Sequence, residues 1–319
     1  MRRSLERLEV LNRRAVSDAF ETDDIDWSLE VDRHKAWEPD ELGALSFLPS
    51  YGLLTPAQRR RCNQLHAIGI CEQFVWFESE LISGINNVRR SAALPRLLDE
   101  ALAHFAAEEC KHTEMFWRLL EKSEPSWYAR RAPRIFRIAP LHQLSMDLMV
   151  AHPQLLTAWV WLAIFVEERT LYLSRMHMST AKRFPLQVDA LHTQVHSFHF
   201  RDEVRHYQLD QHLLTWIYDP QPRWKKRIAA LMFGRFMRVF VAARRSAGHI
   251  LTQLAAEHPE IAGTLVPRMR AELRGLPRNA RYHQMHFGPA ATPRTLKLLA
   301  EYREHDALWD ELPAAKEAL

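Results

Sequence analysis

Two short motifs in the sequence combine a carboxylate and an imidazole at helical spacing. Glu109 and His112 form a Glu-x-x-His sequence, and Glu203 and His206 form a second one. On an α-helix, residues three positions apart share a face and lie about 5–6 Å apart, so each pair could bind one metal ion. One such match arises easily by chance, whereas two matches on separate helices predict a paired site for two ions.

A paired site inside a helical bundle requires one further glutamate from each of two more helices. In the first half of the chain, Glu78 lies within an aromatic run that begins at Phe74. In the second half, Glu167 and Glu168 follow a long apolar run. Glu167 is the favoured ligand because Glu168 shares a helix face with Arg175, which indicates a charged outer surface. Glu168 stays open as the alternative.

A third histidine extends the second motif. His199 lies one turn before Glu203, so it shares that face and is a candidate additional ligand. A site of four glutamates and three histidines would hold two ions, and this mixture of oxygen and nitrogen donors suits Fe or Mn better than Zn or Cu. His192, His196 and His212 occupy the same segment, and we expect them to be polar residues outside the site.

The elements that must position these residues follow from the spacing of apolar residues and prolines. Four long helices are predicted in two pairs, over residues 55–88, 95–122, 153–178 and 186–217. A longer link rich in Pro and Arg separates the pairs, which is typical of a four-helix bundle with one long crossover. Further helices are predicted over residues 3–20 and 223–256, and two shorter ones over 264–275 and 293–304. We therefore expect an all-α chain that forms a single domain over 1–319, with a bundle core at about 55–218 and basic amphipathic helices at about 223–304.

The composition agrees with a helical protein and excludes several other classes. The chain has 319 residues, of which 47% are hydrophobic and 26% charged, and only 9 are glycine against an average usage of about 7%. The net charge of +4 gives no reason to expect nucleic-acid binding. The basic start lacks the apolar core of a secretory signal, and no apolar stretch reaches the ~20 residues of a transmembrane helix. The three cysteines lack metal-finger spacing, so we expect reduced thiols in a cytoplasmic protein.

One basic segment lies outside the predicted bundle. Arg223 to Arg245 carries eight basic residues interspersed with apolar ones. We expect a helix packed on the bundle with a solvated basic face. The alternatives are a dock for an acidic carrier protein and a contact with a membrane surface.

The second motif and its surroundings resemble a known family. The segment from His199 to His206 resembles the His-x-x-Asp-Glu-x-x-His signature of the di-iron arylamine N-oxygenases, the family of the p-aminobenzoate N-oxygenase of aureothin biosynthesis. The resemblance implies a ferritin-like bundle and a metal site of seven residues, which map here onto Glu78, Glu109, His112, Glu167, His199, Glu203 and His206. The chain departs from the family at Glu108, where the family often has Asp.

The resemblance also implies an activity. It predicts a di-iron oxygenase that uses O2 as co-substrate and an external electron donor to oxidise a small organic substrate, such as an arylamine nitrogen. A di-metal desaturase or hydroxylase of an aliphatic or carrier-bound chain is the alternative. A ferroxidase or iron-storage protein is disfavoured because ferritin subunits are shorter, and a helical interaction protein with accidental motifs is the remaining option. A homodimer stays open.

Overall fold

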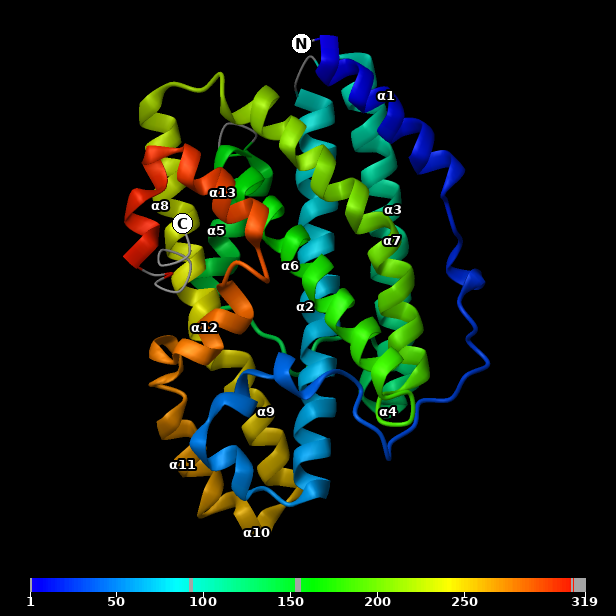
Figure 1. Cartoon of the computed structure of the whole chain (residues 1–319), viewed down its shortest axis with the longest axis vertical. Helices are drawn as coiled ribbons and strands as arrows, with labels where there is room; N and C mark the ends of the chain where they lie inside the picture. The colour runs from blue at the N-terminus through cyan, green and yellow to red at the C-terminus, as the bar shows by residue number, and fades with distance from the viewer. Residues whose placement is uncertain (1, 92–93, 153–155, 311, 313–319) are drawn as a thin grey trace.

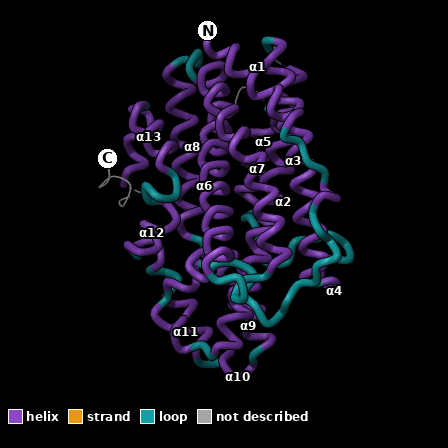
Figure 2. Tube along the Cα trace, turned by 45° about the vertical axis from the view of Figure 1, so that its right-hand side comes forward, coloured by secondary structure: helices purple, strands orange, loops and turns teal. Residues whose placement is uncertain are grey.

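The computed structural model describes all of the chain except residues 1, 92–93, 153–155, 311 and 313–319. In the described part, 13 α-helices and several short 3₁₀ turns account for the regular structure, and Ala36 and Val188 form an isolated β-bridge. Figure 1 and Figure 2 show the long helices standing side by side along the length of the molecule. The prediction of an all-α ferritin-like bundle with additional helices at both ends is confirmed.

The four bundle helices are α2 (Pro56–Ser91), α3 (Arg96–Ser123), α6 (Leu156–Arg183) and α7 (Ala190–Leu213). α2 packs against α3, α6 packs against α7, and α3 and α7 join the two pairs. Their facing sides bury large apolar residues, which favours the bundle through the hydrophobic effect. The bundle therefore brings the two motif-bearing helices, α3 and α7, next to each other.

α7 begins four residues later than the sequence predicts. Asp189 caps the helix by accepting a hydrogen bond from the backbone N–H of His192 at 2.9 Å. The backbone before it is instead occupied by the pairing with Ala36, whose carbonyl accepts from the Asp189 N–H at 2.8 Å. At its other end α7 continues as a π-helical turn over Leu214–Tyr218, close to the predicted end.

The prediction of one helix over 223–256 is wrong, because the structure has two. α8 (Arg223–Ala242) ends at Ala243, which has a left-handed backbone with a φ of 46°, and α9 (Arg244–Glu257) follows. The break lets α8 pack on α6 while α9 turns to pack on α2.

The remaining helices surround the bundle. α1 (Arg2–Ser17) lies across α3 and α7, and an arm of 3₁₀ turns leads from it to α2. The others are α4 (Pro125–Tyr128), α5 (Pro140–Ala151), α10 (Pro259–Ala262), α11 (Leu265–Glu272), α12 (Ala280–Phe287) and α13 (Pro293–Glu301). The sequence did not predict α5 or α12. In the described residues, none of the helices combines the length and apolar character needed to span a bilayer.

Candidate metal centre

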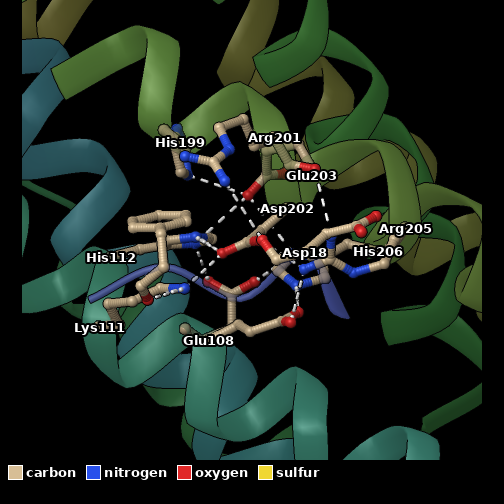
Figure 3. Close-up of polar contacts among 12 residues, drawn as sticks. Asp18, Glu108, Lys111, His112, His199, Arg201, Asp202, Glu203, Arg205 and His206 are labelled. Atoms are coloured by element: carbon tan, nitrogen blue, oxygen red, sulfur yellow. Dashed lines mark hydrogen bonds and ion pairs between the residues drawn. The ribbon is translucent and has the colours of Figure 1, made fainter. Parts of the chain in front are cut away.

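The structure brings all seven predicted residues together in the middle of the bundle. α2 contributes Glu78, α3 contributes Glu109 and His112, α6 contributes Glu167, and α7 contributes His199, Glu203 and His206. Each of them is at most 3% exposed. Figure 3 shows His112 of α3 in one cluster with His199, Glu203 and His206 of α7.

Four of these residues form one compact group across α3 and α7. One donor atom from each of Glu109, His112, Glu203 and His206 lies within 4.8 Å of the others. The Nδ1 atom of His206 is 2.8 Å from Glu109 Oε1 and 3.4 Å from Glu203 Oε1. The Nδ1 atom of His112 lies 3.5 Å from oxygens of the same two carboxylates. The two Glu-x-x-His motifs therefore contribute to one site.

A second group lies beside the first and shares His112 with it. One donor atom from each of Glu78, His112 and His199 lies within 4.8 Å of the others. The Nε2 atom of His199 is 3.2 Å from Glu78 Oε1 and 2.9 Å from Glu203 Oε1. Because Glu203 contacts histidines of both groups, it lies at the junction between them.

The two candidate glutamates of α6 have different surroundings. Glu167 Oε2 lies 4.0 Å from His206 Nδ1 and so adjoins the first group. Glu168 instead accepts hydrogen bonds from the backbone N–H groups of Arg294 and Thr295, at 3.0 and 2.7 Å, at the start of α13. Glu168 is only 6% exposed, so the expected charged outer surface is not what separates the two residues. What separates them is that α13 covers Glu168.

Several donor atoms at the centre have no hydrogen-bond partner in the described part of the chain. They are Glu78 Oε1, both carboxylate oxygens of Glu109, both ring nitrogens of His199, and the Nδ1 atoms of His112 and His206. Buried polar atoms are normally paired, because leaving one unpaired costs about 1–3 kcal/mol. Carboxylate oxygens and imidazole nitrogens that converge without assigned hydrogen-bond partners fit metal ions, and this donor set suits Fe or Mn.

The outer nitrogens of two histidines are held by carboxylates from the opposite helix. His206 Nε2, on α7, lies 2.8 Å from Glu108 Oε2 on α3. His112 Nε2, on α3, lies 3.1 Å from Asp202 Oδ2 on α7. Since an ionised carboxylate only accepts, each Nε2 carries the hydrogen and each Nδ1 presents its lone pair to the centre.

Two cations neutralise these supporting carboxylates. Arg205 donates to Glu108 at 2.6 Å and also to Asp202. Lys111 Nζ lies 2.7 Å from Asp202 Oδ2. Although burial opposes ionisation of Asp202, the bond to His112 and the nearby cations hold its pKa well below the usual value.

The sequence contains a repeated pattern that indicates these supporting acids and bases. The spacing of the ligands alone does not reveal it. In both motifs an acid precedes the glutamate, as Glu108 and Asp202, and a base precedes the histidine, as Lys111 and Arg205. The repeated order is acid, glutamate, any residue, base, histidine. We noted Glu108 only as a departure from the family, whereas the structure gives it a defined partner.

The pKa values of the acids at the centre are shifted in different directions by their surroundings. Burial and the negative charges of Glu203 and Glu109 raise the pKa of Glu167 well above its usual value. Burial also opposes ionisation of Glu109, but His206 and His112 outweigh it and lower the pKa of Glu109. Asp210, one turn beyond His206, is buried without a hydrogen-bond partner among the described residues, and burial raises its pKa well above the usual value.

The other histidines of α7 do not join the two groups. His192 stacks on Trp37 and its Nε2 atom lies 3.0 Å from the Ser123 hydroxyl. His196 stacks on His177, and burial lowers the pKa of His196 to about 3. His212 is half-buried at the end of α7.

A cavity of about 470 Å³ lies beside α2 and α6, and none of the seven candidate ligands is among the residues that line it. Phe77 and Val166 line it, and they directly precede Glu78 and Glu167 in the sequence. The rest of its wall comes mainly from α5, α8 and α9. Its volume lies within the range of cavities that hold small organic ligands.

A helical bundle whose two paired helices converge on buried Glu and His residues defines a ferritin-like protein with a carboxylate- and histidine-rich candidate metal centre. The model of the p-aminobenzoate N-oxygenase AurF family matches residues 2–254, which include the whole bundle, and the chain belongs to this family of oxygenases. No curated protein matches the chain.

Proposed function

We propose that the chain is a non-haem di-iron oxygenase that activates O2 to oxidise a small organic substrate, with N-oxygenation of an arylamine as its reaction. The proposal rests on membership of the N-oxygenase family together with the buried cluster of Glu and His residues. An external electron donor would supply reducing equivalents.

The charge of the buried cluster is the observation that best supports two metal ions. The four candidate ligand glutamates, together with Glu108 and Asp202, make six carboxylates. Among the described residues, only the cations Arg205 and Lys111 form direct ion pairs with them. With all six carboxylates ionised and the histidines neutral, as metal ligands would be, four negative charges remain, which is the charge that two divalent ions neutralise. Without such ions, burial of that charge would be very unfavourable.

Seven residues would hold the ions in this proposal. One ion would be held by the group that contains Glu109 and His206, and the other by the group that contains Glu78 and His199. Glu203 and His112 lie where the groups meet, and Glu167 completes the set in preference to Glu168. Mn is compatible with the same donors, but Fe supplies the redox chemistry that O2 activation requires.

The protein's own residues would prepare this site in three ways. Glu108 and Asp202 fix the orientation of His206 and His112 through their Nε2 hydrogens. The apolar neighbours Phe74, Phe105 and Phe116 pack against the histidine rings and exclude water. The cavity beside Phe77 and Val166 would receive the organic substrate close to the centre.

Metal analysis followed by a single-turnover reaction tests the proposal. After anaerobic loading with Fe(II) and removal of free metal, we expect about two Fe per chain. The reduced protein should then consume O2 and convert an arylamine such as p-aminobenzoate to N-oxygenated product, detected by mass spectrometry. A metal content near zero would refute the metal centre, and two bound Fe with no arylamine product would favour a desaturase or hydroxylase.

A further inference from the structure

The mouth of the cavity is bordered by two rows of exposed apolar side chains. On α5, Leu141, Leu144 and Leu148 are 58%, 53% and 45% exposed. Their neighbours His142 and Ser145 line the cavity, so this row borders it. Large aliphatic side chains at positions i, i+3 and i+7 of one helix form a continuous stripe, which is unusual on a surface that faces only water.

The second row lies on α8, across the cavity from α5. Trp224, Ile228 and Leu231 are 60%, 43% and 68% exposed, and Val239 continues the row. Val239 itself lines the cavity. Figure 1 shows α5 and α8 on the same side of the molecule. Trp is enriched where proteins meet the interface between lipid and water, because its ring is apolar and its N–H is polar.

The same face is strongly basic. Residues 220–256, which include α8 and most of α9, contain no acidic residue and eight Arg or Lys. Arg137, Arg235 and Arg245 line the cavity and are exposed, and none of them forms an ion pair with a carboxylate in the part of the chain that the structure describes. Burial together with Arg235 and Arg245 lowers the pKa of His142, which shows that these cations act on the same space.

The cavity behind this face is larger than one aromatic ring requires. Its volume of about 470 Å³ is roughly three times the ~150 Å³ of a cavity that takes one benzene molecule. The cavity wall contains no Asp or Glu among the described residues, and most of it is apolar. A substrate with a long apolar part would therefore fill the cavity better than a single ring.

We propose that the face formed by α5 and α8 binds the surface of an anionic membrane, so that the cavity opens toward the lipid and takes a lipophilic substrate from it. The apolar rows enter the interfacial region of the bilayer, and the Arg and Lys side chains contact lipid phosphates. The identity of the substrate as a lipophilic arylamine rests on the proposed function, whereas the membrane contact does not.

Charge and composition favour a membrane over other occupants of this face. A second copy would bring the same basic residues against each other, and like charges across an interface are unfavourable. An acidic carrier protein would match the charge, but it would leave the exposed leucines of α5 and the Trp224 side chain unexplained. An anionic lipid surface matches both the cations and the apolar rows.

Vesicle sedimentation of the full chain tests the membrane contact. We expect the protein to sediment with vesicles of phosphatidylcholine and phosphatidylglycerol, to stay in solution with phosphatidylcholine alone, and to be released by salt. Leu144→Asp and Leu231→Asp should each weaken binding about tenfold or more, since each puts a charge into the interface. Arg235→Gln should weaken binding less. Leu186→Asp, at an 83% exposed position beyond the end of α6, is the matched control and should bind like the parent.

Three outcomes would overturn the membrane contact. They are no sedimentation with the anionic vesicles, an equal loss of binding in the Leu186→Asp control, and binding of an acyl carrier protein through Arg235 without any vesicle binding. The last outcome would replace the membrane by an acidic protein partner. Because none of these measurements requires bound metal or turnover, they remain informative if the oxygenase proposal fails.

A separate binding measurement tests the substrate class. By isothermal titration, 4-dodecylaniline should bind the protein about tenfold more tightly than aniline or better, because its alkyl chain buries apolar surface in the cavity. Equal affinities would limit the substrate to a single ring and overturn this part of the proposal, while two bound Fe per chain would still support the metal centre.

Discussion

At the scale of single residues, the candidate centre depends on contacts that neither motif can make alone. Glu203 Oε1 lies 2.9 Å from His199 Nε2, 3.4 Å from His206 Nδ1 and 3.5 Å from His112 Nδ1. One carboxylate oxygen therefore faces three imidazoles from two helices. Such an arrangement is stable only if cations, whether protons or metal ions, lie between these atoms.

The first prediction separates the neighbouring glutamates of α6. Glu167→Gln should lose bound metal, because it removes a carboxylate that adjoins His206. Glu168→Gln should keep the metal but lower the free energy of unfolding by about 1–2 kcal/mol, because it weakens charge-assisted hydrogen bonds to the start of α13. Metal analysis and urea unfolding of both variants measure the two effects. Full metal content in Glu167→Gln with loss in Glu168→Gln would reverse the assignment.

The second prediction concerns pH. Burial favours the neutral form of His199, but Glu203 and Glu78 outweigh it and raise the pKa of His199 to about 10. In the metal-free protein His199 is therefore protonated at neutral pH, and a metal ion must displace this proton. Fe(II) affinity should rise between about pH 6 and about pH 8, with proton release on binding.

Anaerobic Fe(II) titrations in weakly buffered solution measure the released protons. His199→Gln should release fewer protons than the parent, and His34→Gln, at an exposed position of the arm, should release the same number. Binding without proton release in the parent would contradict the prediction.

The sequence predicts the residues of the centre better than it predicts the carboxylates that hold the histidines in place. Glu109 and His112, or Glu203 and His206, are related by the geometry of one helix, so spacing alone places them on one face. The pairs between Glu108 and His206 and between Asp202 and His112 depend on the register of α3 against α7, which tertiary packing sets. The pattern of apolar residues within one helix cannot predict how far that helix is shifted along its neighbour.

At the scale of elements, the long bundle helices follow from their apolar periodicity, whereas the breaks and short helices do not. The ends of α2 and α3 lie within three residues of the predicted ends, because Pro residues and apolar spacing mark them. Ala243 gives no signal for a break, since Ala is the best helix former. The helix ends there because α8 and α9 pack on different bundle helices, α6 and α2. The sequence analysis did not predict α5, because its sequence resembles a link between helices. α5 is helical in the structure, where it packs on α2.

The third prediction tests the strain at this break. Ala243→Gly should raise the free energy of unfolding by about 0.5–1 kcal/mol, because Gly adopts the left-handed backbone without the steric cost of a Cβ atom. Ala242→Gly, in the last helical position of α8, should lower it by a similar amount. Urea unfolding of the two neighbouring variants provides the comparison. A destabilised Ala243→Gly variant would show that the left-handed backbone stores no relievable strain.

At the scale of the whole molecule, segments far apart in the sequence meet near the start of α2. Arg61, near the start of α2, lies 2.7 Å from Glu124 at the end of α3 and 2.6 Å from Glu257 at the end of α9. Arg33 of the arm also contacts Glu124, at 3.2 Å. This network ties the bundle, the arm and the C-terminal helices together at one point.

The fourth prediction follows from this network. Arg61→Ala should lower the free energy of unfolding by about 1–3 kcal/mol. In the part of the chain that the structure describes, it leaves the nearly buried Glu124 with only the partly exposed Arg33 as a cationic partner. Arg59→Ala, at an exposed position on the same turn, is the control and should change stability by less than about 0.5 kcal/mol. Equal unfolding energies for both variants in urea would mean that the network contributes nothing measurable.

The crossed support of the two histidines has a consequence for how the chain matures. Glu108 orients a histidine of the second helix pair, and Asp202 orients a histidine of the first. A nascent chain that had completed only α2 and α3 would carry Glu78, Glu109 and His112, yet the imidazole of His112 would still rotate freely. If the centre holds the iron proposed above, its complete set of oriented ligands exists only after synthesis has passed His206 and the two helix pairs have docked.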